Sequence, residues 1–188
     1  MPRPDDLDDS PFSHLRDELI HEGQVVSMFE GYFEGPDGAE LRRDIVRHPG
    51  AVSVVAVTAD DEIYLVRQYR APIDSDLWEI PAGKKDVQGE PPEVTAAREL
   101  QEEVGVLAGS FEPLINLYHS PGFCDEYQNV YLATDLRPGE RAVDGAEEEH
   151  MVVAKVPFSE AIEMALDGSI TDAKSIVGIL AAARKLGK

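Results

Sequence analysis

The sequence predicts an α/β sandwich built around a mixed β-sheet. Three observations support this prediction: β-branched runs flank one central helical segment, two more helical segments close the chain, and an alternating pattern with a turn signal begins it. Strands before and after a helix pack in layers because each sheet face must bury its apolar side chains. With 188 residues, the chain fits one domain that can bury a real core.

The N-terminal part is expected to hold a tail and a hairpin. The opening residues, MPRPDDLDDSP, are acidic and proline-rich, which predicts a disordered tail over residues 1–11 and no signal peptide. Residues 19–33 and 39–47 alternate apolar and polar side chains around Pro36-Asp37-Gly38, a turn signal between two strands. We therefore assign residues 12–48 to an N-terminal hairpin region and residues 49–188 to the main domain.

The main domain is expected to place strands on both sides of one helix. The β-branched run that starts at Ala51 predicts a deeply buried strand. Asp172 and two glycines, Gly168 and Gly187, mark the ends of the closing helices. In chain order we expect strands at 51–57, 63–69 and 77–80, a helix at 92–104, strands at 111–119, 128–134 and 151–156, and helices at 158–167 and 172–186.

Composition excludes several classes of function. Thirty-seven acidic against 17 basic residues give a net charge of −20, which argues against binding to nucleic acid or to an anionic membrane surface. The single cysteine, Cys124, excludes an intrachain disulfide and a multi-cysteine zinc site. No apolar run approaches the roughly 20 residues that span a bilayer. We expect a soluble, cytoplasmic protein.

The central helix concentrates carboxylates in the segment Arg98-Glu99-Leu100-Gln101-Glu102-Glu103-Val104-Gly105-Val106. At about 100° per residue, Glu99 and Glu103 lie on one face with Glu102 beside them. Like charges at this spacing destabilise a helix by about 0.2–0.5 kcal/mol, so a function is indicated. Mg²⁺ prefers oxygen ligands and commonly lies between carboxylates and substrate phosphates. The alternative is a solvated acidic helix face.

The segment from Gly83 to Val106 resembles the Nudix box: Gly, five residues, Glu, seven residues, then Arg-Glu-aliphatic-x-Glu-Glu-x-Gly-aliphatic. Every fixed position from Glu90 onward matches, although six residues rather than five separate Gly83 from Glu90. A solvated acidic face would not explain the matching Gly, Arg and aliphatic positions. The resemblance implies an α/β/α sandwich and the hydrolysis of nucleoside diphosphates linked to another group.

The sequences flanking the box resemble the ADP-ribose pyrophosphatase subgroup at Val66–Arg70, Trp78–Gly83 and Ser120–Phe123. This resemblance implies hydrolysis of ADP-ribose to AMP and ribose 5-phosphate with Mg²⁺, or with Mn²⁺ or another divalent cation. It also implies a homodimer. The alternatives are hydrolysis of another nucleoside diphosphate sugar or a dinucleotide, and a nucleotide-binding regulator that has lost catalysis.

The family resemblance assigns site residues by role. The main metal ligands are Glu99 and Glu103, Glu102 is a third or shared ligand, and the carbonyl of Ala82 completes the set. Arg98 is expected to pair with Glu102 or Glu90 and to hold the carboxylates in place. A late acidic loop supplies the catalytic carboxylate, for which we choose Glu148 with Glu147 and Glu149 as alternatives. A solvated acidic loop is the competing interpretation.

Three further residues are expected to contact substrate. Arg70 is the best candidate for clamping a phosphate, because a guanidinium binds phosphate oxygens bidentately. By resemblance, Arg43 reaches the substrate of a second subunit and Glu126 reaches the site from the 120s loop. The competing interpretation of both arginines is as surface charges. Apolar residues of the hairpin suggest a dimer interface, against the alternative that the hairpin folds onto its own domain: Val25, Met28, Phe29, Tyr32 and Phe33.

Overall fold

The computed structural model describes residues 10–142 and 150–188. The chain divides into two compact units. One unit consists of Met1–Pro49 with Ser120–Glu126, and the other of Gly50–His119 with Tyr127–Lys188. In the described residues, no helix combines the length and apolar character needed to cross a bilayer.

The N-terminal unit is a three-stranded antiparallel sheet in the order β1-β2-β3. Its strands are β1 (Ser13–Glu22), β2 (Ser27–Glu34) and β3 (Glu40–Arg47). The turn predicted between β2 and β3 is confirmed: Gly38 has φ +77°, a conformation that glycine adopts without steric cost. The 120s loop also belongs to this unit, and Arg47 Nη1 donates to Asp125 Oδ2 at 3.0 Å.

The prediction of a single strand over residues 19–33 is wrong. Residues 19–22 end β1, and the backbone N–H of Gly23 donates to the carbonyl of Val26 at 2.9 Å to close a turn before β2. Residues 21–24, His-Glu-Gly-Gln, carry no apolar side chain and include a glycine, and this local turn signal was overlooked. The expected N-terminal hairpin is thus a three-stranded sheet.

The main unit contains one mixed and one antiparallel sheet, as expected for an α/β sandwich. The mixed sheet has the order β7-β4-β9-β8, in which β4 and β9 are parallel and the other pairs are antiparallel. The antiparallel sheet has the order β10-β5-β6. The strands are β4 (Ala51–Ala56), β5 (Glu62–Arg70), β6 (Ser75–Glu79), β7 (Ala82–Lys84), β8 (Val106–Tyr118), β9 (Tyr127–Pro138) and β10 (Val152–Pro157).

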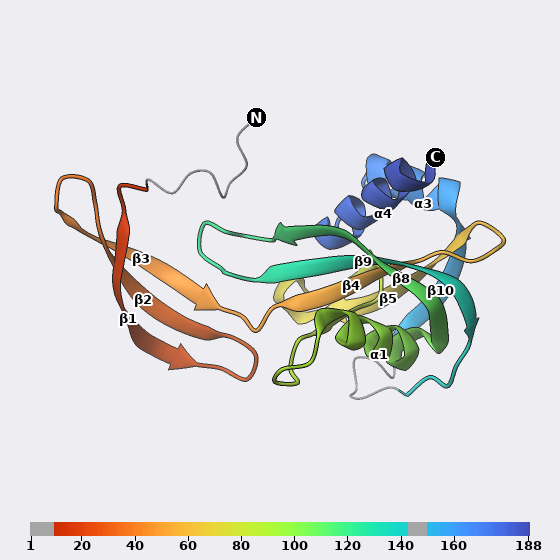
Figure 1. The fold of residues 1–188 in the computed structure, drawn as a ribbon, viewed down its shortest axis with the longest axis horizontal. Helices are drawn as coiled ribbons and strands as arrows, with labels where there is room; N and C mark the ends of the chain where they lie inside the picture. The colour runs from red at the N-terminus through yellow and green to blue at the C-terminus, as the bar shows by residue number, and fades with distance from the viewer. Residues whose placement is uncertain (1–9, 143–149) are drawn as a thin grey trace. The chain divides into compact units, whose positions relative to one another are not determined.

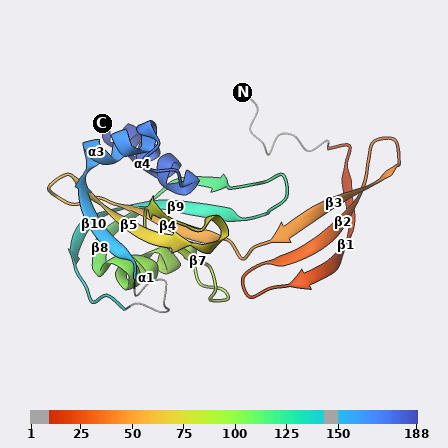
Figure 2. The same cartoon turned by 180° about the vertical axis from the view of Figure 1, so that it is seen from behind.

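Helices cover this unit on two sides. Figure 1 shows α1 (Pro92–Val104) below the strands and both α3 (Phe158–Asp167) and α4 (Ala173–Leu186) above them, and Figure 2 shows the same layers from behind. A short 3₁₀ helix, η2 (Ala71–Ile73), links β5 to β6. The α/β/α prediction is confirmed, with helix bounds that match the predicted ones within one residue.

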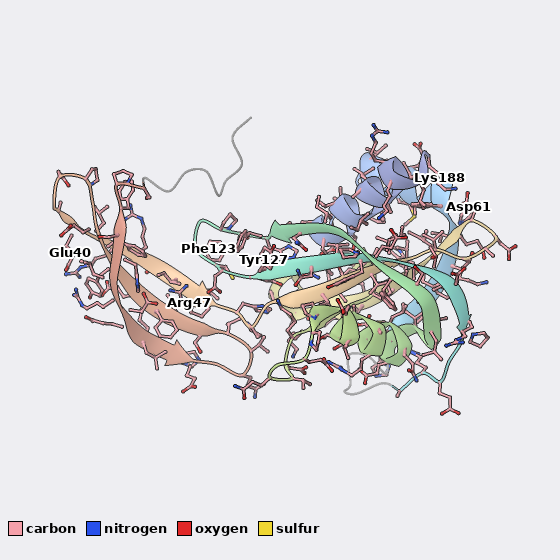
Figure 3. All side chains as sticks on the ribbon, in the orientation of Figure 1. Glu40, Arg47, Asp61, Phe123, Tyr127 and Lys188 are labelled. Atoms are coloured by element: carbon pink, nitrogen blue, oxygen red, sulfur yellow. The ribbon has the colours of Figure 1, made fainter. Side chains whose placement is uncertain are left out.

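Strand β4 is buried along its whole length and divides the core in two. Val52, Val54 and Ala56 pack with Ala96 and Leu100 of α1, whereas Val55 packs with residues of β5, β9, α3 and α4. Alternate residues of a strand point to opposite faces, so one strand serves both layers. The closing helix is fastened at its end, where Lys188 Nζ pairs with Asp61 Oδ1 (Figure 3).

Several strands of the main unit differ in their bounds from the predictions, most of all β7 and β8. Strand β7 forms at residues for which no strand was expected, and β8 begins at Val106 rather than at residue 111. Gly109 looked like a break, but a Cβ added there would lie 2.9 Å from the Cβ of Asp135, so the glycine permits a close approach of two strands.

Asp172 caps α4 from a buried position. Its carboxylate accepts a hydrogen bond from the backbone N–H of Ser175 at 3.0 Å and pairs with Lys174 at 2.9 Å. Burial alone would raise the Asp172 pKa, but the charge of Lys174 and the hydrogen bonds from Ser175 and Lys174 lower it below the ordinary 3.8. The charged carboxylate therefore stabilises the fold.

We predict that Asp172→Asn lowers the free energy of unfolding at pH 7 by about 1 kcal/mol, because asparagine keeps the cap but loses the charge. Since the folded pKa is depressed, the stabilisation is fully present above the unfolded value and is lost as pH falls through the folded pKa. Chemical denaturation from pH 7 to pH 2.5 should show the two proteins converging. Asp60→Asn, at an exposed aspartate, is the control. Equal stabilities at pH 7 would contradict the assignment.

Candidate metal and phosphate site

Helix α1 buries acidic side chains as well as apolar ones. It begins after Pro91 and ends at Gly105, which has φ +77°. Ala96 and Leu100 anchor it on the sheet, and the neighbouring Glu99 and Glu103 are only 8% and 4% exposed. Because a buried carboxylate needs polar or charged partners, the surroundings of these acids determine what the site can do.

Both acids pack against β7. The Glu103 Oε2 atom accepts a hydrogen bond from the backbone N–H of Ala82 at 3.0 Å. Glu99 lies so close to Gly83 that a Cβ added to this glycine would overlap its carboxyl group. The first glycine of the predicted box therefore leaves room for the Glu99 carboxyl group, whereas the role of the Ala82 carbonyl as a metal ligand stays a prediction.

Arg98 links the acids of the box. Its Nη1 atom lies 2.8 Å from Glu102 Oε2 and 2.9 Å from Glu99 Oε1, and its Nη2 atom lies 3.5 Å from Glu90 Oε2. Thr95 Oγ1 also donates to Glu90, at 2.8 Å. The structure thus contains both pairings expected of Arg98, with Glu102 and with Glu90.

The positive charge of Arg98 only partly offsets the effect of burial on Glu99. Burial raises its pKa to about 7, Arg98 opposes this rise, and the negative charges of Glu102 and Asp86 add to it. A cation beside a carboxylate favours its ionised form. Oxygen donors of this kind suit a hard divalent cation such as Mg²⁺.

The acidic side chains of the described residues do not converge on one common position. Across residues 10–142 and 150–188, no group of three His, Cys, Asp or Glu side chains is gathered in a metal-binding arrangement. The Arg98 guanidinium contacts both Glu99 and Glu102. The donor types fit a divalent cation, and Arg98 supplies the positive charge in this arrangement.

Arg70 lies at the end of β5 and binds a buried acid. Its Nε and Nη2 atoms donate to the two carboxylate oxygens of Glu79 at 2.7 and 2.5 Å. The hydrogen bond to Glu79 raises the Arg70 pKa against the effect of burial, and the charges of Asp172 and Glu103 add smaller contributions. The Arg70 side chain is nevertheless 39% exposed, so part of the guanidinium faces outward.

Two charged partners behind Arg70 were missed by sequence reasoning. Glu79 is fully buried and also receives a hydrogen bond from Lys174 Nζ at 2.5 Å, although 95 residues separate the two. The available signal was Glu79 itself, an acid between Trp78 and Ile80 in a predicted strand. An acid in an apolar strand requires a buried partner, but the sequence does not say which residue supplies it.

The other expected site residues lie outside this unit or outside the described residues. Arg43 is exposed on β3 and its Nη1 donates to the carbonyl of Arg42 at 2.7 Å. Arg43 and Glu126 belong to the N-terminal unit, and their roles in substrate binding stay predictions. The late acids Glu147, Glu148 and Glu149 lie outside the described residues, so the choice among them also stays a prediction.

Comparisons with known proteins agree with the box. The model of the NUDIX domain family matches residues 47–176. An ADP-ribose pyrophosphatase of Mycobacterium tuberculosis is 41% identical over 170 residues, which cover 90% of this chain and 82% of that protein. A methanol dehydrogenase activator of Bacillus methanolicus is 39% identical, with 88% and 89% covered. A crystal structure of an ADP compounds hydrolase has the same fold, with a TM-score of 0.79 at 23% identity and 94% of each chain covered.

We predict that Gly83→Ala displaces Glu99 and weakens Mn²⁺ binding about 10-fold or more, because supporting positions around a metal site typically carry effects of this size. The clash is with the mobile end of a side chain, so the unfolding temperature should change little. Calorimetric titration with Mn²⁺ measures the first effect and thermal unfolding the second. Gly122→Ala is the control, because a Cβ there meets open space. Unchanged Mn²⁺ affinity in Gly83→Ala would refute the role of this contact.

Proposed function

We propose that this chain, which belongs to the NUDIX domain family, is a magnesium-dependent hydrolase that cleaves ADP-ribose into AMP and ribose 5-phosphate. The observation that carries the proposal is the packing of Glu99 and Glu103 against Ala82 and Gly83. The similarity to a pyrophosphatase named for ADP-ribose favours this substrate over other nucleoside diphosphates.

The carboxylates of α1 would hold the metal. Glu99 and Glu103 are the main ligands, with Glu102 and the carbonyl of Ala82 completing the set. Bound Mg²⁺, or Mn²⁺ or another divalent cation in its place, polarises phosphoryl oxygens and lowers the pKa of a bound water. Glu99 and Glu102 would have to share their carboxylates between the metal and Arg98, which contacts both acids, whereas the contact of Arg98 with Glu90 would be unaffected.

The remaining roles belong to groups that hold substrate or move a proton. Arg70 binds a phosphate oxygen with the outward part of its guanidinium. Glu148, or Glu147 or Glu149 in its place, accepts the proton of the attacking water. Arg43 and Glu126 contact the rest of the substrate, with Arg43 reaching it from a second subunit.

Two alternatives follow from the relatives and the chemistry. Another nucleoside diphosphate sugar or a dinucleotide offers the same pyrophosphate to the same groups. A regulator without catalysis is the second, and one similar protein is named for activating another enzyme. The retained Glu99, Glu102 and Glu103 favour a hydrolase, because binding alone does not require three clustered acids. We place the enzyme in the cytoplasm, acting on a small molecule and not on nucleic acid or membranes, as its single cysteine and net charge of −20 indicate.

We predict that the purified protein releases AMP and ribose 5-phosphate from ADP-ribose only when a divalent cation is present. Glu103→Gln should lower turnover by about 100-fold or more while keeping the fold, because its amide oxygen still accepts from Ala82 but the charge is lost. Chromatography of the products at saturating Mg²⁺ is the measurement.

The matched control is Glu93→Gln, which changes an exposed acid on the same helix. Near wild-type turnover of Glu103→Gln would show that the metal assignment is wrong. A panel of nucleoside diphosphate sugars and dinucleotides, assayed in parallel, identifies the substrate if ADP-ribose is not cleaved.

We propose a homodimer through the sheet of the N-terminal unit. Large apolar side chains on β1, on β2 and in the turn between them are exposed: Leu15, Leu19, Ile20, Val25, Val26 and Met28. Of the residues expected to form this surface, Tyr32 is instead buried, with the Arg16 guanidinium 3.7 Å from its ring centroid. Exposed apolar clusters of this kind favour a second protein surface, and a two-fold interface would bury them on both copies.

Light scattering should therefore give a dimer mass. If Arg43 acts across the interface, mixing Arg43→Ala chains with Glu103→Gln chains should restore one working site per heterodimer. A monomeric mass with full activity would contradict the dimer. Absence of recovery, after subunit exchange has been verified, would mean that Arg43 acts within its own chain.

A further inference from the structure

Four charged side chains form a buried series of ion pairs between β5, β6 and the start of α4. Arg70 binds Glu79, Glu79 binds Lys174 Nζ at 2.5 Å, and Lys174 binds Asp172 at 2.9 Å. The side chains of Glu79 and Lys174 are 1% and 9% exposed. Two cations alternate with two anions, so the series is neutral as a whole.

Stability alone does not account for this arrangement. Removing charges from water costs several kcal/mol per ion, on the order of what their attraction returns, and apolar side chains of similar volume often serve a fold equally well. Val55 and Ile80, both fully buried in the core beneath α4, show that this region can use apolar side chains. The charges are therefore better explained by what they hold in place.

The buried charges hold the side chain of Arg70, which is partly exposed. Glu79 engages the Nε and Nη2 atoms, and within the described part of the chain Nη1 makes no hydrogen bond. A guanidinium held along one edge presents its other edge in a fixed direction. Lys174 shares the Glu79 carboxylate, so Arg70 is not the sole counterion of a buried acid.

The same end of α4 also holds the segment that leads to the metal box. Ser175 Oγ accepts a hydrogen bond from the backbone N–H of Ile80 at 2.8 Å. Two residues later, the N–H of Ala82 donates to Glu103. The contacts of Lys174 and Ser175 thus hold Glu79 and Ile80, at the start of the short path to Ala82 that joins the proposed phosphate-binding and metal-binding parts of the site.

We propose that Lys174 is a positioning residue for pyrophosphate cleavage: its ammonium group holds the Glu79 carboxylate, which directs the Arg70 guanidinium toward a substrate phosphate. This inference rests on the proposed function, in which Arg70 binds a phosphate oxygen. Lys174 itself is buried and touches no substrate. Because the effect is transmitted through Arg70, it must disappear when Arg70 is removed.

A double-mutant cycle tests this dependence. We would measure kcat and KM for ADP-ribose with the wild type, Lys174→Met, Arg70→Ala and the double variant. Lys174→Met should raise KM about 10-fold and leave kcat nearly unchanged, as expected for the loss of a supporting contact to a substrate-binding group. The double variant should match Arg70→Ala, because Lys174 has nothing left to position. Lys185→Met is the control, since Lys185 lies on the same helix and pairs with an exposed acid.

The outcomes separate this inference from the proposed function. The positioning role would be overturned if Lys174→Met changed KM by the same factor with and without Arg70. It would also be overturned if Lys174→Met left KM unchanged. Wild-type kinetics of Arg70→Ala would overturn the role of Arg70 and the inference together. Calorimetric titration of the same four proteins with ADP measures the double-mutant cycle from binding affinities, so this test does not depend on catalytic turnover. A non-additive cycle for ADP binding with no cleavage of ADP-ribose would reject the proposed substrate but support the positioning role.

Folding of the variants needs its own safeguard, because Lys174→Met leaves Glu79 with one counterion in a buried place. Thermal unfolding identifies a variant that fails to fold. In that event Glu79→Gln combined with Lys174→Met removes both buried charges at once. This pair should also raise KM about 10-fold in the presence of Arg70 and not in its absence. Equal effects in both backgrounds would again overturn the inference.

Discussion

The close packing of α1 against β7 is the constraint on which the site depends. Glu99 can lie against the strand because position 83 has no side chain, and the backbone N–H of Ala82 gives the other buried acid, Glu103, a partner. The apolar residues Ala96 and Leu100 fix the rotation of the helix on the mixed sheet. The packing of apolar residues thus determines which acids face the sheet. The absence of a Cβ at Gly83 allows the carboxyl group of Glu99 to approach β7 closely.

Electrostatics then decides how an acidic chain can work on an anionic substrate. With a net charge of −20, the surface as a whole repels phosphates. The cations of the main unit that matter are placed individually: Arg98 lies among the acids of the box, and Arg70 and Lys174 alternate with buried carboxylates. Local pairing, rather than a positive patch, makes the site compatible with a nucleoside diphosphate.

Local patterns predicted the elements whose signals lie within a few residues. Helix α1 was bounded correctly because Pro92 and Gly105 mark its ends and its apolar residues recur with helical spacing. The break between β1 and β2 was missed although residues 21–24, His-Glu-Gly-Gln, interrupt the apolar pattern, and β7 was missed because a strand of three residues is too short for a periodic pattern. The partnership of Glu79 with Lys174 joins residues 95 positions apart, and no periodicity encodes such a contact.

Arg98 also bears on how this site balances folding against binding. A guanidinium that already neutralises Glu99 and Glu102 lets the acidic helix pack before any metal arrives. A metal bound by Glu99, as we propose, would compete with this guanidinium, and displacing it would reduce the net free energy of metal binding. With a neutral residue at position 98, the acids would attract a cation more strongly. The four carboxylates that pair with Arg98 would then have no counterion within the protein: Asp86, Glu90, Glu99 and Glu102. Under the proposed metal assignment, Arg98 would make the metal a ligand that the folded protein can release, rather than a component that the fold requires.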